Sequence, residues 1–122
     1  MEEEGGGFLL DIVADDFGFC EARNRSILHC YEHGMVTRAS MLVAFPAAKD
    51  GAKAAAAAGL PLGLHFNVTE LATVCPPSTV SSLFAPAEDG SLHLRSKFEF
   101  AAAVADGSVL LEHVRQEFIA QM

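Results

Sequence analysis

The sequence predicts an α/β fold in which parallel strands alternate with crossover helices. Three observations support this prediction. Short apolar runs alternate with helix-like segments in the order β-α-β-α-β over the first half of the chain. Glycine or proline separates most of these segments, as expected at the ends of helices and strands. A length of 122 residues with 51% hydrophobic content is sufficient for one domain with its own core.

Five elements are predicted in this first half. The nearly continuous apolar run after the N-terminal glycines suits a buried parallel strand, and the helical spacing of Ile27, Leu28 and Tyr31 predicts the helix that follows. An alanine-rich run predicts a second helix, which Gly59 ends. In order, the predicted elements are a strand over 8–14, a helix over 21–33, a strand over 36–43, a helix over 46–58 and a strand over 62–68.

The composition changes after the third predicted strand. Residues 71–95 are rich in Pro, Ser and Thr, so we expect a long excursion with a small hairpin around 91–94. Long loops in compact domains are often functional, which makes this excursion a candidate substrate lid. Two helices, at 98–105 and 109–122, are predicted to follow it. The charged, glycine-rich residues 1–7 are expected to form a flexible tail.

The charge balance and the cysteines indicate which partners and which compartment to expect. Sixteen acidic residues against eight Lys and Arg give a formal charge of −8. Non-specific binding to nucleic acid or to an anionic membrane needs clustered positive charge, so neither partner is expected. Three cysteines without C-x-x-C spacing suit free thiols, and the acidic N-terminus does not resemble a secretory signal. We therefore expect a cytoplasmic protein.

Two adjacent aspartates, Asp15 and Asp16, follow the first predicted strand. Carboxylates at the end of a buried strand need compensation. A bound cation provides it if one carboxylate ligates the ion while the other stays free as a base. The alternative is that one aspartate caps the following helix and the other is solvated.

His65 lies in the segment Gly63-Leu64-His65-Phe66-Asn67, near the end of the third predicted strand. The carboxyl ends of parallel strands share one edge of a sheet, so we expect this histidine near the acidic pair. A carboxylate and an imidazole at that edge would suit a divalent metal. The alternative is a hydrogen-bonded core histidine, which is the commoner case for a lone histidine in an apolar strand.

Taken together, these motifs resemble the YdjC family of carbohydrate deacetylases, which includes the chitooligosaccharide deacetylases. Each match is weak by itself, but their order and spacing are specific, and they cover nearly the whole chain from Phe8 onward. The matching segments are Ala14-Asp15-Asp16-Phe17-Gly18, Asn24 with Ile27, Gly34-Met35-Val36-Thr37, Ser40-Met41-Leu42-Val43, Gly63-Leu64-His65-Phe66-Asn67, the Gly90 turn before Lys97-Phe98, and residues 117–121.

The resemblance implies a TIM-barrel-like fold and a metal-dependent hydrolase that removes acetyl groups from N-acetylated sugars or oligosaccharides. It implies Asp15 as the general base, Asp16 and His65 as metal ligands, and a divalent cofactor, Mg²⁺ or Zn²⁺. Asn24 and Asn67 are expected to bind substrate or to order the loops. The resemblance also implies a third ligand, a histidine in an H-x-H-like stretch on the next strand, which these 122 residues do not include.

Residues 8–122 are therefore expected to be the N-terminal part of a deacetylase domain, truncated at about half of a family member's length. With two of three ligands, the alternative is a non-catalytic fragment or pseudo-enzyme that acts through protein association, including a homodimer. A response-regulator receiver domain has a similar length and an acidic pair. It needs a phospho-accepting aspartate at the end of its third strand, where this chain has His65.

Overall fold

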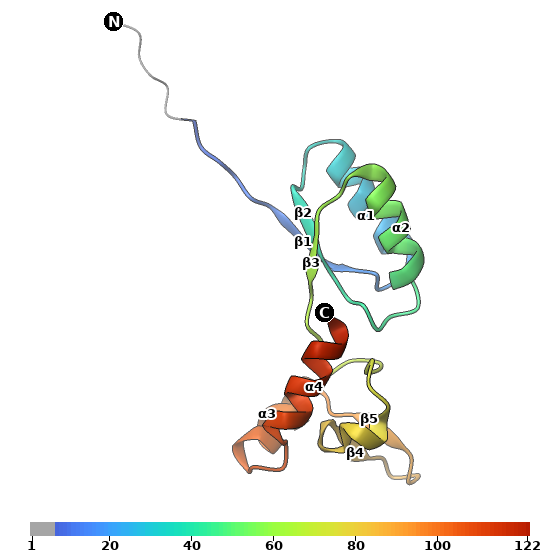
Figure 1. Cartoon of the computed structure of the whole chain (residues 1–122), viewed down its shortest axis with the longest axis vertical. Helices are drawn as coiled ribbons and strands as arrows, with labels where there is room; N and C mark the ends of the chain where they lie inside the picture. The colour runs from blue at the N-terminus through green and yellow to red at the C-terminus, as the bar shows by residue number, and fades with distance from the viewer. Residues whose placement is uncertain (1–6) are drawn as a thin grey trace, which may run out of the picture.

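The structure, a computed structural model, describes residues 7–122 (Figure 1). A three-stranded parallel sheet in the order β1-β2-β3 contains Val13–Phe17, Arg38–Met41 and Leu62–Leu64. The helices α1 (Glu21–Glu32) and α2 (Ala48–Ala58) connect these strands in turn. This arrangement confirms the predicted α/β class with parallel strands and crossover helices, and it is consistent with one part of a barrel.

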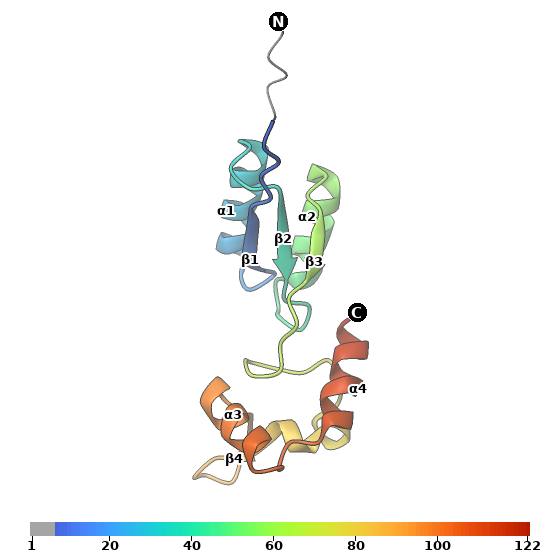
Figure 2. The same cartoon turned by 90° about the vertical axis from the view of Figure 1, so that its left-hand side faces the viewer.

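Both helices cover the same face of the sheet, as Figures 1 and 2 show from two directions. The core between sheet and helices contains Phe17, Ile27, Ala39, Ala55 and Leu60, all buried. Burial of a large side chain such as Phe17 or Ile27 contributes about 1.5–3 kcal/mol. No helix within residues 7–122 covers the opposite face of the sheet (Figure 2).

The second half of the chain lies beyond the carboxyl ends of the parallel strands (Figure 2). Its small core contains the buried residues Val80, Leu83 and Leu94. Its elements are the 3-10 helices η1 (Pro77–Thr79) and η2 (Ser81–Leu83), the antiparallel strands β4 (Phe84–Pro86) and β5 (Leu92–Leu94), and the helices α3 (Lys97–Ala105) and α4 (Leu111–Gln121). The predicted hairpin and the two predicted helices are thus present.

The first strand begins later than the sequence predicts. The apolar run is not a buried strand at its start, because Phe8 and Leu9 are fully exposed. Pairing between β1 and β2 begins only at Val13 and Arg38. Hydrophobic pattern alone cannot show where a partner strand ends, which explains the error. The predicted tail over 1–7 falls, except for Gly7, outside the described residues.

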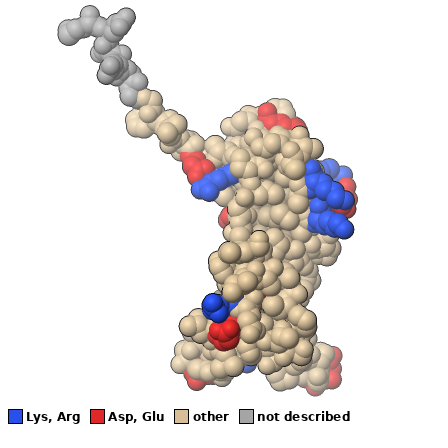
Figure 3. All heavy atoms as spheres, viewed as in Figure 1, with Lys and Arg blue, Asp and Glu red and all other residues tan. Residues whose placement is uncertain are grey.

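The surface carries charged side chains in small groups. In Figure 3 most of the surface is uncharged, and the charged groups lie mainly toward its margins. One such group is the ion pair of Arg38 with Asp11. Hydrogen bonds from Arg38 and Thr37 hold the pKa of the Asp11 carboxyl below its ordinary value. Among residues 7–122, no helix has the length and apolar character needed to cross a membrane.

Candidate active site at the carboxyl edge of the sheet

The acidic pair lies within β1, at a point where the strand departs from regular geometry. The pairing register of β1 with β2 shifts between Ala14 and Phe17. Asp16 adopts a left-handed backbone conformation with φ of 63°. Regular strand geometry would point Asp15 and Asp16 to opposite faces of the sheet. The irregularity lets both carboxylates take part in one hydrogen-bonded cluster at the carboxyl edge.

His65 follows β3 and lies directly beside this pair. Its backbone N–H donates to the carbonyl of Met41 at 2.9 Å, which extends the β2–β3 ladder by one bond. Its Nδ1 lies 3.3 Å from Oδ1 of Asp16 and 3.1 Å from Oγ of Ser40. Ser40 also donates to Oδ1 of Asp15 at 3.0 Å. We call Asp15, Asp16, Ser40 and His65 the edge cluster.

Arg23, on the first turns of α1, adds a positive charge to the edge cluster. Its Nη1 lies 2.9 Å from Oδ2 of Asp16, the carboxylate oxygen that His65 does not contact. Its guanidinium also lies 4.4 Å above the ring of Phe19. Both side chains of the ion pair are about 40% exposed, so solvent screens their attraction. The guanidinium therefore serves mainly to orient Asp16.

The donor atoms of Asp16 and His65 fit a small divalent ion. A carboxylate oxygen and an imidazole nitrogen are ligands that zinc accepts. Two such donors, each about 2.1 Å from one ion at a tetrahedral angle, lie about 3.4 Å apart, which agrees with the observed 3.3 Å. Within the described residues no group of three His, Cys, Asp or Glu side chains is arranged to hold an ion. The edge cluster thus offers two ligands.

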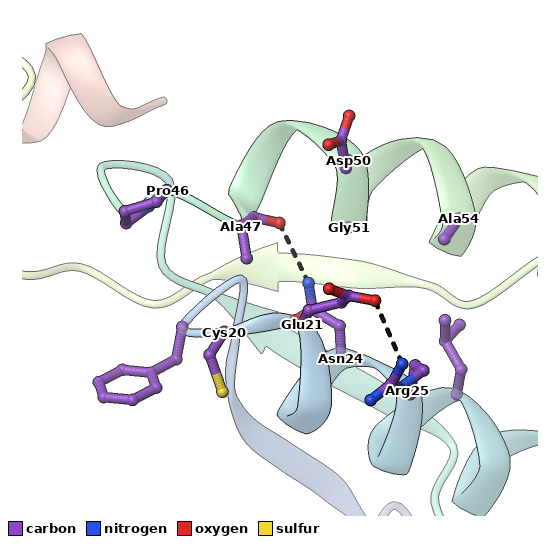
Figure 4. A pocket seen from close by; sticks show the side chains of 11 residues that line it. Cys20, Glu21, Asn24, Arg25, Pro46, Ala47, Asp50, Gly51 and Ala54 are labelled. Atoms are coloured by element: carbon purple, nitrogen blue, oxygen red, sulfur yellow. Dashed lines mark hydrogen bonds and ion pairs between the residues drawn. The ribbon is translucent and has the colours of Figure 1, made fainter.

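Asn24, predicted to bind substrate or to order loops, holds two loops together. Its buried side chain accepts from the N–H of Gly18 at 2.6 Å and donates to the carbonyl of Ala47 at 3.0 Å. These bonds join the turn after β1 to the start of α2. Figure 4 shows the second bond as a dashed line. A buried amide with both groups satisfied is suited to ordering these loops.

Asn67, which carries the same prediction, shapes the loop after β3. Its Oδ1 accepts from the N–H groups of Thr69 and Glu70, and its Nδ2 donates to the carbonyl of Glu70. This local turn leaves the side chain with few free hydrogen-bonding atoms. Its backbone N–H and carbonyl pair with the side chain of Gln121 on α4. The contacts of Asn67 therefore favour loop ordering.

A groove lies between α1 and α2, away from the edge cluster (Figure 4). It encloses about 850 Å³. Asn24 is the one predicted site residue on its wall; Asp15, Asp16 and His65 do not line it. The groove is lined by Phe19, Cys20, Glu21, Asn24, Arg25, Leu28, Pro46, Ala47, Asp50, Gly51 and Ala54. Because the proposed base and ligands lie outside this groove, we assign the candidate site to the edge cluster.

Sequence reasoning gave no role to two residues of this region, Ser40 and Arg23. The role of Ser40 follows from strand pairing: Ser40 is opposite Gly63 on β3, two residues before His65, and alternation along the strand then places Ser40 and His65 on one face of the sheet. No sequence pattern indicates the role of Arg23, because its approach to Asp16 depends on the turn between β1 and α1.

The chain resembles known proteins over most of its described length. The family of YdjC-like proteins matches residues 9–122. A carbohydrate deacetylase of Mus musculus is 39% identical over 114 residues, covering 93% of this chain and 36% of the relative. A chitooligosaccharide deacetylase of Serratia marcescens is 39% identical over 66 residues, covering 50% of this chain and 24% of the relative.

A solved structure supports the fold. A protein of Enterococcus faecalis V583, named for cellobiose-phosphate cleavage, superposes with a TM-score of 0.73 and 27% identity. The match covers 91% of this chain and 41% of that chain. The chain spans about a third of the length of the mouse relative, less than the half that the sequence led us to expect. From the agreement of a family match over residues 9–122 with this structural likeness, we conclude that the chain belongs to the family of YdjC-like proteins.

Proposed function

We propose that the edge cluster is the metal-binding and base-carrying part of a carbohydrate deacetylase that hydrolyses the acetamide of an N-acetylated sugar. The observation that carries this proposal is the 3.3 Å separation of Asp16 Oδ1 and His65 Nδ1, with Asp15 joined to the same histidine through Ser40. The names of the relatives, which are carbohydrate and chitooligosaccharide deacetylases, support the choice of substrate class.

Each residue of the edge cluster has a distinct task in this proposal. Asp16 and His65 would hold Zn²⁺ or Mg²⁺, with further ligands from outside residues 7–122 or from water. When bound, the ion would supply Lewis acidity toward the acetamide carbonyl and toward an attacking water. Asp15 would accept a proton from the water as the water oxygen forms a bond to the carbonyl carbon. The C–N bond would then break as that proton passes from Asp15 to the nitrogen, which leaves Asp15 ionised and gives a free sugar amine and acetic acid, which ionises to acetate.

The proposal is tested with three variants of the chain, Asp15→Asn, Asp16→Asn and His65→Gln. Calorimetry measures Zn²⁺ and Mg²⁺ binding, and an acetate assay measures turnover of N-acetylglucosamine oligomers. We expect Asp15→Asn to retain ion binding and to lower kcat by about 100-fold or more. We expect the other two variants to lose ion binding and turnover together.

His29→Gln is the matched control, because His29 is an exposed histidine on α1 whose side chain takes no part in the edge cluster. It should bind ions and release acetate as the unmodified chain does. If the unmodified chain releases acetate, equal release by Asp15→Asn would overturn the assignment of the base. Failure of the unmodified chain to bind either ion would overturn the metal site.

A second candidate function is association without catalysis. Within residues 7–122 the edge cluster provides two ion ligands, and several large apolar side chains are exposed on α4, including Leu111 and Ile119. Ion binding without acetate release, together with a concentration-dependent change of mass in sedimentation, would favour this second candidate. A monomeric chain that releases acetate would exclude it.

A further inference from the structure

We propose that Ser40 is a positioning residue that fixes the base Asp15 and the imidazole of His65 relative to one another. This inference rests on the proposed function for the roles of those two residues. Ser40 lies on β2, the central strand of the sheet, between the strand that carries the aspartates and the strand that leads to His65. Its Oγ lies 3.0 Å from Asp15 Oδ1 and 3.1 Å from His65 Nδ1.

The strand geometry explains why Ser40 can reach both partners. Its neighbour Ala39 is fully buried in the core beneath α1 and α2. Successive side chains of a strand point to opposite faces, so Ser40 points away from the helices. Asp15 and His65 approach from the strands on either side. A hydroxyl on the central strand is thus placed to bridge the two flanking strands.

The hydrogen-bond donors and acceptors at Ser40 determine which nitrogen of His65 carries a proton. A hydroxyl has one hydrogen to donate, and an ionised carboxylate can only accept. Ser40 therefore donates to Asp15 and accepts from Nδ1–H of His65. The other neighbour of that nitrogen, Asp16 Oδ1, is also an acceptor. In the ion-free chain Ser40 thereby stabilises the Nδ1–H form of the ring and limits its rotation.

Ser40→Ala tests this role through one measurement that needs no turnover. Long-range ¹⁵N spectra at a fixed pH of about 8, at which an ordinary histidine is neutral, report which ring nitrogen of His65 carries the proton, with the signal assigned from His65→Gln. We expect Ser40→Ala to shift the population from the Nδ1–H toward the Nε2–H form. The proposed ion would take the place of the proton on Nδ1, so the spectra are recorded without added ion.

Two further variants separate positioning from general damage. Ser40→Thr keeps the hydroxyl on a residue suited to strands and should restore the Nδ1–H form. Ser26→Ala removes an exposed serine of α1, whose hydroxyl donates to the carbonyl of Ala22, and should leave the tautomer population unchanged. Circular dichroism confirms that each variant is folded.

The outcomes distinguish this inference from the proposed function. An unchanged tautomer population in Ser40→Ala would overturn the role of Ser40. Absence of Zn²⁺ binding by the unmodified chain would overturn the metal site, while the tautomer measurement would still decide on Ser40.

Discussion

Asp16 combines three features that regular strand residues do not have. Its φ is positive, its Oδ1 lies beside His65, and its Oδ2 lies beside Arg23. A left-handed conformation costs a residue other than glycine about 1 kcal/mol or more, although aspartate tolerates it better than most. The surrounding contacts offset this cost. Such a local cost at a cluster of ionisable side chains is typical of functional sites.

Gly18 is needed next to this cluster for two reasons. Its φ is +94°, and a Cβ at this position would lie 2.7 Å from the carbonyl oxygen of Leu42. We therefore expect Gly18→Ala to lower the free energy of unfolding by about 2 kcal/mol, measured by urea denaturation.

Gly63→Ala is the control for this prediction. Gly63 has no positive φ, and a Cβ there would meet no atom within 4 Å. Its effect should stay within about 0.5 kcal/mol. Equal stability of the two variants would show that the turn at Gly18 accommodates a side chain.

At the scale of elements, helix α3 shows how local sequence defines a boundary. Ser96 accepts from the N–H of Glu99, and the Glu99 carboxylate accepts from the N–H of Ser96 at 2.7 Å, which together form a capping box. The pKa of Glu99 lies below its ordinary value. The backbone hydrogen bond from Ser96 is the main cause, followed by hydrogen bonds with the side chains of Ser96 and His93. The carboxylate form is thus favoured in the folded state.

The capping box gives a pH-dependent prediction. Because the pKa of Glu99 is lowered in the folded state, its carboxylate stabilises the fold fully at pH values above the ordinary pKa of 4.5. This stabilisation is lost as the pH falls through the lower pKa of the folded state. Glu99→Ala should therefore speed amide exchange in the first turn of α3 several-fold at pH 6, and the difference should vanish at strongly acid pH. Glu88→Ala, an exposed glutamate between β4 and β5, should leave exchange in α3 unchanged at both pH values.

For the whole molecule, a buried carboxylate joins distant segments of the chain. Glu117 on α4 is fully buried and accepts from the N–H groups of Val74 and Cys75 at 2.7 and 2.9 Å. Gln121, one turn later, donates to Glu117 and to the carbonyl of Asn67. Burial, and then Glu117, raise the pKa of the Cys75 thiol. These contacts tie α4 to the loop that follows His65.

Removal of this carboxylate should affect stability well beyond α4. We expect Glu117→Ala to lower the free energy of unfolding by about 3 kcal/mol, because two backbone N–H groups and the amide of Gln121 lose their acceptor. Urea denaturation measures the loss, and amide exchange at Val74 and Cys75 locates it.

Glu112→Ala is the matched control on the same helix. The Glu112 side chain is 60% exposed and lies 3.7 Å from Arg115. Its loss should change stability by no more than about 0.5 kcal/mol. A similar small effect of Glu117→Ala would show that the loop after β3 is held by other contacts.

The sequence by itself determined the α/β class, the order of the first five elements and the approach of His65 to the acidic pair. These depend on hydrophobic period and on the shared edge of parallel strands, both of which are local or topological properties. Only the tertiary structure decided the start of β1, the left-handed backbone of Asp16, and the contacts of Ser40, Arg23 and Glu117. These depend on which segments meet in space, which residue pattern does not encode.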